Sequence, residues 1–384
     1  MPAPPMRILH VTPFYEPAWA YGGMARAASE LCRALARRGH DIVVVTAQLD
    51  PAHAPDETLG GVSVRRFAGP GFLGRRLVPW APGLASFIQQ LHPAPQLAHL
   101  HGHRNGLAVA ATRALASAGI PWLLQPHGTY PLHDQHVWAK RLFDRLAGRR
   151  SVGGARRLLA VSAAEARELP EPALVVPNGV RPPAPASTAA REPRRLLFVG
   201  SDAPQKRGSL LPAVLGALPG VRLELVGRFG RGFVAAFGAF GERLVVSGVL
   251  EGQALADAYA RAAIVVHPAR SEAFGLVPFE AALFGTPAVV AGGHGCGEWV
   301  ARAGGAVVPP DDVPALVAAL RLRLDDPSIG AREAAAVAAF ARRELQWEQV
   351  AGAVEALYQS LLAEGSPATA TGGGGFGGAK PPAR

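Results

Sequence analysis

Cysteine is scarce in this chain of 384 residues, in which only Cys32 and Cys296 occur. Two distant cysteines exclude the disulfide framework of a small secreted domain, and no C-x-x-C pair offers a zinc or redox site. No apolar run reaches the roughly 18 residues of a membrane-spanning helix, and the first residues lack a signal-peptide pattern. We therefore expect a cytoplasmic protein that neither crosses a membrane nor is secreted.

Acidic residues are relatively few in the first half of the chain. Residues 1–185 contain 20 Lys and Arg against 11 Asp and Glu, whereas residues 186–384 contain 19 against 18. A basic half is typical of proteins that contact nucleic acid or an anionic membrane surface, and also of a solvated arginine-rich face. No nucleic-acid-binding module with interleaved aromatic residues is recognisable, so we expect no nucleic-acid partner.

Short apolar runs alternate with helical patterns along most of the chain. An apolar run at 7–13, an amphipathic helix at 23–39 and a second run at 41–47 predict a βαβ unit. The alternation stops in the proline-rich segment 180–193 and resumes at residue 195. This pattern predicts an α/β fold class with two Rossmann-like domains of parallel strands in tandem.

These observations give the expected domain boundaries. The first domain spans 1–183 and the second spans 184–345, followed by a helix at 346–364. The tail 365–384 is rich in glycine and small residues and has too little apolar content to pack, so we expect it to be disordered.

Two glutamates flank a glycine in the segment RSEAFGLVPFEAALFGTPAVVAGG, residues 270–293. In open α/β sheets, ligands bind after the carboxyl ends of strands, where helix N-termini present free N–H groups. Gly275 lets the backbone approach a diphosphate, and the carboxylate of Glu280 can accept hydrogen bonds from a vicinal diol such as a ribose. The alternative is a helix-dipole role for Glu280 and a solvated loop charge at Glu272.

The order of several segments resembles the retaining glycosyltransferases of the GT-B fold, specifically family 4, with their E-x7-E motif. The resemblance covers about residues 7–362 and rests on the segments YGGMARAASELCRALARRGHDIVVVT, PHGTYP, LLAVSAAEARE, VVPNGV, LLFVGSDAPQKRG, LELVGR, SEAFGLVPFEAALFGTPAVV and GAVVPPDDVPALVAAL.

The resemblance implies roles for individual residues. His127, Glu272 and Lys206 match the catalytic group: a histidine near the donor sugar, a glutamate at its reacting face and a lysine that neutralises the leaving diphosphate. Glu280 matches the glutamate that holds the nucleotide ribose. The remaining positions implied in donor binding are Gly22, Gly23, Phe274, Gly275 and Leu276.

One position departs from the family pattern. Many members carry an arginine after the glycine that ends the first strand of the second domain, whereas this chain has Ser201. Diphosphate neutralisation then depends on Lys206, with Arg207 or Arg228 as substitutes. No D-x-D pair indicates a metal, so we expect transfer without a metal or cofactor, with the lysine and helix dipole acting in its place.

The family implies transfer of a hexose from a nucleoside diphosphate sugar to an acceptor hydroxyl, with retention at the anomeric carbon. The first domain would bind a glycan or lipid-linked acceptor and the second the nucleotide, and the helix at 346–364 would return to the first domain. Three alternatives stay open: a noncatalytic nucleotide-sugar-binding protein, and an epimerase or phosphorylase of the same fold. A nicotinamide dehydrogenase is disfavoured because no G-x-G-x-x-G follows the first strand.

Two basic stretches of the first domain combine arginines with apolar residues. Residues 71–91 carry Arg75, Arg76, Leu77, Trp80, Leu84, Phe87 and Ile88, and residues 140–157 are rich in Lys and Arg. Apolar anchors beside arginines are typical of an interfacial surface. We therefore expect peripheral contact with an anionic membrane through the first domain. The alternative is that the apolar residues pack into the core and the arginines solvate it.

Overall fold

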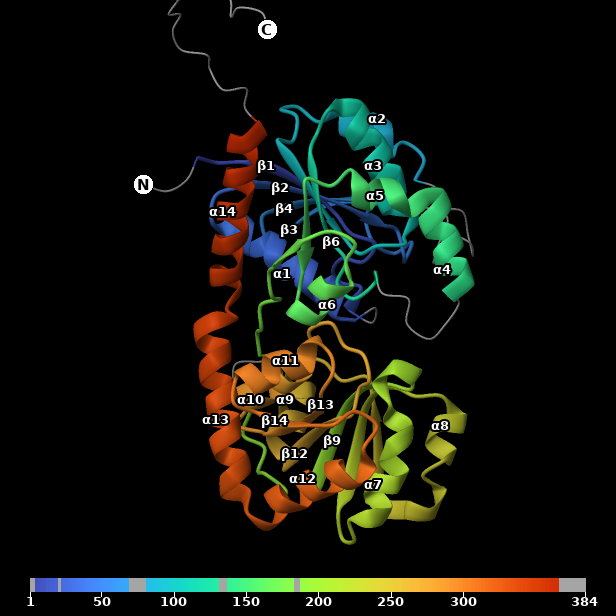
Figure 1. The fold of residues 1–384 in the computed structure, drawn as a ribbon, viewed down its shortest axis with the longest axis vertical. Helices are drawn as coiled ribbons and strands as arrows, with labels where there is room; N and C mark the ends of the chain where they lie inside the picture. The colour runs from blue at the N-terminus through green and yellow to red at the C-terminus, as the bar shows by residue number, and fades with distance from the viewer. Residues whose placement is uncertain (1–3, 20–21, 69–80, 131–136, 183–186, 366–384) are drawn as a thin grey trace, which may run out of the picture.

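The computed structural model describes residues 4–19, 22–68, 81–130, 137–182 and 187–365. Two sheets with helices against their faces lie one above the other (Figure 1). Apart from the antiparallel pair β3–β4, all strand pairs of the described residues are parallel. This confirms the predicted α/β class with two Rossmann-like domains.

The first sheet has the strand order β3-β4-β2-β1-β5-β6-β7-β8. Its strands are β1 (Arg7–Val11), β2 (Asp41–Ala47), β3 (Asp56–Leu59), β4 (Val62–Phe67), β5 (Leu97–His101), β6 (Trp122–Gln125), β7 (Arg157–Ala160) and β8 (Ala173–Val175). β2, β3 and β4 lie on one side of β1 in the sheet, and β5 to β8 lie on the other side. The strand order therefore reverses between β1 and β5. This switch point brings the loops after β1 and β5 to one place, where such sheets bind ligands.

Helices cover both faces of the first sheet. They are α1 (Gly23–Arg37), α2 (Leu84–Gln90), α3 (Gly106–Ala118), α4 (Val137–Phe143), the π-helical turn η3 (Asp144–Gly148), α5 (Arg149–Gly153) and α6 (Ala163–Glu168). Alternate residues of β1 face opposite cores: Ile8 packs with α1, whereas Leu9 packs with α2 and α3. Asn105 caps α3 by accepting a hydrogen bond from the Ala108 amide.

The second sheet has the order β11-β10-β9-β12-β13-β14. Its strands are β9 (Arg195–Ser201), β10 (Arg222–Arg228), β11 (Leu244–Gly248), β12 (Ile264–His267), β13 (Ala288–Ala291) and β14 (Ala306–Val308). Its helices are the short turns η4 (Pro204–Lys206), η5 (Gly208–Leu210) and η6 (Gly238–Arg243), with α7 (Leu211–Ala217), α8 (Arg231–Ala235), α9 (Gly252–Arg261), α10 (Val277–Leu283), α11 (Gly295–Arg302), α12 (Val313–Asp325) and α13 (Pro327–Glu344).

The last helix, α14 (Trp347–Gly365), leaves the second domain and runs along the first (Figure 1). Trp347, Val354 and Tyr358 are buried in the same core as Ile8 and residues of α1. Arg38 beyond α1 also forms an ion pair with Glu355. The predicted return of the C-terminal helix to the first domain is therefore confirmed.

One expectation is corrected by the packing. Leu84 and Ile88, read as membrane anchors, are buried in the core between α2 and α3, and Phe87 packs against that core. These side chains pack inside the protein and are not available to insert into a bilayer. Arg75, Arg76, Leu77 and Trp80 lie outside the described residues, as do residues 366–384 of the tail.

Candidate active site

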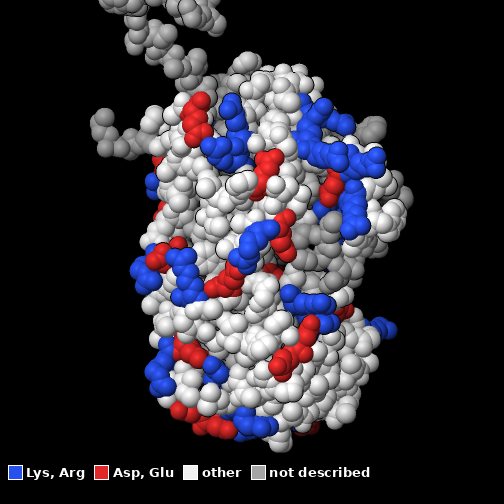
Figure 2. Space-filling model, in the orientation of Figure 1, with Lys and Arg blue, Asp and Glu red and all other residues white. Residues whose placement is uncertain are grey.

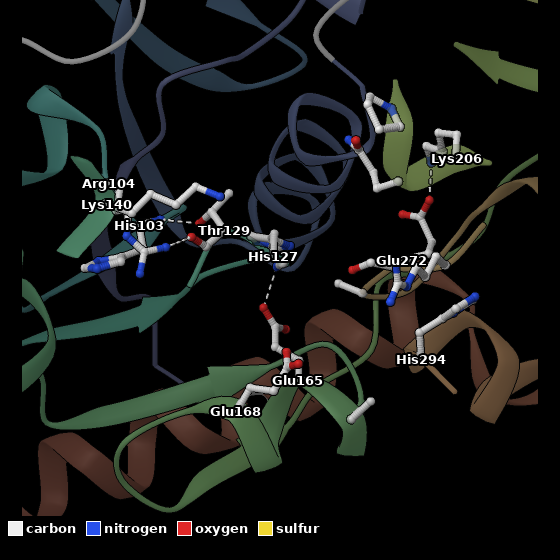
Figure 3. Close-up of a pocket in the computed structure, with 18 of the residues that line it drawn as sticks. His103, Arg104, His127, Thr129, Lys140, Glu165, Glu168, Lys206, Glu272 and His294 are labelled. Atoms are coloured by element: carbon white, nitrogen blue, oxygen red, sulfur yellow. Dashed lines mark hydrogen bonds and ion pairs between the residues drawn. The ribbon is translucent and has the colours of Figure 1, made fainter. Parts of the chain in front are cut away.

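A cavity of about 980 Å³ lies between the two domains at the carboxyl ends of both sheets. His127, Lys206 and Glu272, the three residues predicted to be catalytic, all line it. In Figure 3, Lys206 and Glu272 lie on one side of the cavity and Arg104 on the other, with His127 between them. Parallel strands aim their following loops at the same edge, which explains how distant segments converge here.

The second-domain side of the cavity holds a lysine–glutamate pair. Lys206 Nζ in η4 contacts Glu272 Oε2 in the loop after β12, and His267 Nε2 lies 3.9 Å from the same carboxylate. Burial acts to raise the pKa of Glu272, but the Lys206 ammonium, with smaller contributions from His267 and His294, holds that pKa below its ordinary value. Glu272 is therefore a carboxylate, and Lys206 already has an anionic partner before any phosphate arrives.

Glu280 lies at the fourth position of α10, buried beside Tyr259 and Arg26. The Tyr259 hydroxyl donates to Glu280 Oε2 at 2.8 Å, and Arg26 Nη1 of α1 lies 3.5 Å from Oε1. Burial raises the pKa of the Glu280 carboxyl above its ordinary value, although Arg26 opposes the shift. Because Arg26 belongs to the first domain, this carboxylate also joins the two domains.

The segment between the two glutamates is held by packing. Phe274 is buried, and Gly275 has a φ of 76°, a conformation that favours glycine. A Cβ at Gly275 would lie 2.4 Å from Cys296 Sγ. Phe274, Gly275 and Leu276 precede α10, which begins at Val277, so they form the turn into the helix rather than its first residues.

The two proposed arginine substitutes lie elsewhere. Ser201 ends β9, Arg207 pairs with Asp311, and Arg228 is exposed at the end of β10; none of these three lines the cavity. Arg270 does line it, two residues before Glu272, and its amide donates to Gln205 O at 2.9 Å. On the second-domain side of the cavity wall, the cation that accompanies Lys206 is thus Arg270.

His127 occupies a strained position at the centre of the cavity. Its φ of 52° is uncommon for a residue other than glycine, and its Nε2 lies 2.9 Å from His101 Nδ1. Burial lowers the pKa of His127 to about 3, so the ring is neutral. His127 is therefore a half-buried, neutral imidazole in the cavity wall.

Glu165 in α6 holds the loop that carries His127. Its carboxylate accepts hydrogen bonds from the amides of Gly128 and Val161, the latter at 2.7 Å. Gly128 has a φ of 79°, and a Cβ there would lie 2.9 Å from the Ala273 Cβ of the second domain. The two domains therefore approach each other closely at this loop.

The first-domain side of the cavity contains an ordered polar cluster. Arg104 donates to both Asp144 oxygens, at 2.9 and 2.6 Å, and to Thr129 O at 2.6 Å. His103 Nε2 lies 3.0 Å from the same carboxylate. Burial and the Arg104 guanidinium lower the pKa of His103 to about 4, and Asp144 opposes them. This cluster fixes η3 against the loop after β5.

The predicted glycines lie at the start of α1. Gly22 precedes the helix with a φ of 95° and a ψ of −160°, values open to glycine alone. A Cβ on Gly23 would come within 3.9 Å of Leu276 Cδ1. Gly23 thus borders the second domain at Leu276, and neither glycine lines the large cavity.

The sequence prediction missed Glu165, Arg270, Arg104 and the histidine neighbours of His127. Glu165 was visible within the segment LLAVSAAEARE, but its targets are backbone amides, which no sequence pattern identifies. The histidines had a signal: His99 and His101 alternate within a buried strand, where apolar residues are usual.

Comparison with known proteins identifies the family. The family described as "Glycosyl transferase 4-like domain" matches residues 22–180, and "Glycosyl transferases group 1" matches residues 193–326. The D-inositol 3-phosphate glycosyltransferase of Kineococcus radiotolerans is 30% identical, with 92% of this chain and 94% of the relative covered. This chain therefore belongs to the family 4 glycosyltransferases of the GT-B fold.

Solved structures share the fold. Sucrose-phosphate synthase from Thermosynechococcus elongatus superposes with a TM-score of 0.73 at 20% identity, covering 93% of this chain and 100% of that one. The Anabaena protein HepE in complex with UDP-glucose gives a TM-score of 0.72 at 19% identity, covering 92% and 100%.

Proposed function

We propose that this glycosyltransferase moves a hexose from a nucleoside diphosphate sugar to an acceptor hydroxyl, with retention of configuration and without a metal. The observation that carries the proposal is the Lys206–Glu272 pair beside His127 in the interdomain cavity. A diphosphate that enters beside Lys206 replaces Glu272 as the partner of the ammonium. Glu272 is then free to act on the sugar while Lys206 takes up the charge of the leaving group.

The same reasoning assigns the ribose to Glu280. Its carboxylate already accepts a hydrogen bond from Tyr259, and a vicinal diol can take the place that Arg26 holds at 3.5 Å. Support also comes from the UDP-glucose complex of HepE, which has the same fold. Lys206 and Arg270 supply the positive charge that a metal would otherwise provide.

A donor panel tests this proposal. Purified protein is heated with UDP, GDP and ADP sugars in turn, and the matching donor raises the melting temperature, with about 2.7 kcal/mol of stabilisation at 100 times its Kd. Proton NMR of the transfer product then gives the anomeric configuration. Stabilisation without donor hydrolysis or transfer would identify a noncatalytic binding protein. An isomerised sugar in the product would identify an epimerase. A sugar phosphate formed from inorganic phosphate would identify a phosphorylase.

We further propose that the acceptor is a glycan or lipid-linked hydroxyl reached at an anionic membrane surface, in surface polysaccharide or glycolipid synthesis. None of the described helices combines the length and apolar character needed to span a bilayer. The surface at α4, η3 and α5, here called the α4 surface, does carry exposed apolar residues: Trp138 is 73% exposed, Leu142 47% and Leu146 72%. Their spacing of four places them on one helical side.

Basic residues surround this apolar row. Figure 2 shows Lys and Arg gathered over the α3 to α5 region at the upper right. A hollow of about 210 Å³ beside Leu146 is lined by Arg113, Arg149 and Arg150, a setting that suits lipid phosphates. Trp138 and Lys140 also line the large cavity, so a membrane bound to the α4 surface meets the cavity mouth.

Vesicle sedimentation tests the membrane contact. The protein is expected to sediment with vesicles containing phosphatidylglycerol at low salt, less at high salt, and not with pure phosphatidylcholine. The double variant Trp138→Ser/Leu146→Ser should lose this binding, whereas Leu322→Ser, an exposed apolar residue of α12, should keep it. Equal sedimentation with both vesicle types would refute the contact and favour an acceptor in solution.

A further inference from the structure

A hydrogen-bonded series of four histidines and Tyr358, here called the histidine chain, links the active site to the last helix. His127 Nε2 lies 2.9 Å from His101 Nδ1, and His101 Nε2 lies 3.0 Å from His10 Nδ1. His10 Nε2 lies 3.5 Å from the Tyr358 hydroxyl of α14, which in turn lies 2.7 Å from His99 Nδ1. His10 and His99 are neighbours across β1 and β5; these two rings, His101 and Tyr358 are buried, and His127 is half-buried.

The rings of this chain are neutral. Burial lowers the pKa of His10 and of His127 to about 3, and burial with neighbouring histidines lowers the pKa of His99 and His101 well below its ordinary value. A neutral imidazole has one N–H donor and one acceptor nitrogen. Each hydrogen bond in the chain therefore fixes the tautomer of the next ring, and the whole chain has only two directions.

Tyr358 selects between these directions. Its hydroxyl has one hydrogen, and the shorter contact, 2.7 Å to His99 Nδ1, has the length of an O–H···N bond. An imidazole nitrogen is a better acceptor than a phenol oxygen because it is the more basic atom. When Tyr358 donates to His99, its oxygen accepts from His10 Nε2, His10 Nδ1 accepts from His101, and His101 Nδ1 accepts from His127 Nε2.

We propose that His101 is a positioning residue which, through His10 and Tyr358, holds His127 in the tautomer protonated at Nε2. The proposal rests on the proposed function of His127 at the donor sugar. Nδ1 of His127, which has no hydrogen-bond partner among the described residues, is then an acceptor for a sugar hydroxyl. With every hydrogen bond reversed, Nδ1 of His127 would carry the proton and be a donor. The histidine chain therefore decides whether this atom accepts a hydrogen bond from the sugar or donates one.

A metal bound by His10, His99 and His101 is the competing explanation, since ligand atoms of the three lie within 4.8 Å of one another. The geometry favours hydrogen bonds. His10 Nδ1 and His101 Nε2 meet at 3.0 Å in hydrogen-bond geometry, so these two nitrogens point at each other rather than at a common ion. His99 and His101 stack at 4.2 Å with an interplanar angle of 22°, so their ring edges do not converge.

The histidine chain ends at His99 on the side away from the cavity. Nε2 of His99 has no hydrogen-bond partner at bonding distance among the described residues. The side chain of Gln125, whose amide nitrogen donates to Val176 O, acts to raise the pKa of His99, as an acceptor oxygen beside an N–H does. This agrees with a protonated Nε2 on His99, the end state of the chosen direction.

NMR of protein labelled with 15N-histidine tests the proposal without a substrate. Long-range proton–nitrogen correlations distinguish the two neutral tautomers, and the His127 signals are assigned by their loss in His127→Gln. We expect His127 to be protonated at Nε2 and not at Nδ1. A His127 protonated at Nδ1, or a stoichiometric metal in the purified protein, would overturn the proposal.

Variants separate positioning from packing. His101→Leu should populate both tautomers of His127 and lower kcat about tenfold or more, with a smaller change in donor KM. His101→Asn, which keeps an acceptor near the Nδ1 position, should restore the tautomer and most of kcat. Tyr358→Phe keeps the ring of α14 but removes the hydroxyl, and it should mix the tautomers from a distance.

His40→Gln is the matched control, because His40 is also buried beside α14, at 3.3 Å from Glu355, but lies outside the chain. It should leave the His127 tautomer unchanged even if it lowers stability. An unchanged tautomer in both His101→Leu and Tyr358→Phe would overturn the proposal. If no donor sugar is turned over, the proposed function fails, whereas the tautomer measurement still decides the role of His101.

Discussion

At the scale of single residues, the contact between Lys206 and Glu272 gives the lysine two roles to separate. It neutralises a buried carboxylate in the donor-free protein, and we propose that it neutralises the leaving diphosphate during transfer. Only the second role grows in the transition state, so only that role lowers the barrier to reaction. The first role concerns stability, which should return when the Glu272 carboxylate is removed together with Lys206. The second concerns turnover, which should not return.

Lys206→Met is expected to lower kcat about 100-fold or more, the usual cost of losing one group that stabilises developing charge. The double variant Lys206→Met/Glu272→Gln relieves the unpaired carboxylate and should recover melting temperature but not kcat. Steady-state kinetics and thermal unfolding of the unmodified protein and the two variants provide the measurement. Because Glu272 itself acts on the sugar, the kcat of the single variant decides: a Lys206→Met kcat within about threefold of that of the unmodified protein would show that Lys206 does not stabilise the leaving group.

Glu280 should affect donor binding more than turnover. Glu280→Gln keeps the shape of the side chain and an acceptor for Tyr259, but it removes the charge that faces Arg26. A ribose contact is equally strong in the ground state and the transition state, so donor KM should rise about tenfold while kcat stays within about threefold. A fall in kcat at unchanged KM would assign Glu280 to the reacting end of the donor instead.

The sequence predicted the ionisable residues of the site better than the groups that hold them. Glu272 and Lys206 belong to recognisable local segments, and both line the cavity. Glu165 could not be assigned a role, because its partners are the amides of Gly128 and Val161. The histidine chain needs β1 beside β5 and α14 across both. His10 and His101 lie 91 residues apart in sequence, and Tyr358 lies 259 residues from His99.

At the scale of secondary-structure elements, the buried strands and long helices were predicted because their periodicity is strong. The β3–β4 hairpin was missed, although Gly60 and Gly61 form its turn with φ values of 58° and 82°. Two glycines between short strands are a hairpin signal, but DETL is too polar to read as a strand. The exposed row on α4 was likewise missed as an anchor, since residues 84–88 carried a stronger apolar pattern.

The junction between the last two helices depends on one glycine. A Cβ at Gly179 would lie 2.4 Å from the ring of Trp347, which is the first residue of α14. Gly179→Ala is expected to push the tryptophan out of its packing and lower the free energy of unfolding by about 1–3 kcal/mol. Chemical denaturation followed by tryptophan fluorescence measures this loss.

Gly232→Ala is the matched control for that substitution. Gly232 is helical, in α8, and a Cβ there meets no atom within 4 Å. It should leave stability unchanged or raise it by up to about 1 kcal/mol, because alanine favours the helix. Equal stability of the Gly179 and Gly232 variants would mean that α14 tolerates a shift at its first turn.

At the scale of the whole molecule, buried histidines of both domains couple stability to pH. Burial lowers the pKa of His10, His127 and His267 to about 3 in the folded protein, whereas the unfolded chain has its ordinary value near 6.5. Between these values the unfolded state binds more protons, so the free energy of unfolding falls as pH drops below about 6.5. Each such histidine contributes about 1.4 kcal/mol per pH unit.

A differential measurement isolates this effect from the carboxyls Glu165 and Glu280, whose raised pKa acts in the opposite sense. Urea unfolding of the protein and of His10→Gln is compared at pH 7.5, 6.0 and 5.0. The variant should show a shallower fall below pH 6.5, by up to about 1.4 kcal/mol per pH unit. Parallel curves would mean that His10 titrates equally in the folded and unfolded states.

The return of α14 has a consequence for the order in which the protein is made. Trp347, Val354 and Tyr358 complete the core of the first domain, yet they are synthesised after the entire second domain. Domains of a nascent chain generally fold from the N-terminus onward as they leave the ribosome. Here the first domain must wait with an open apolar face, so the second domain, made later, is the first whose own core is complete.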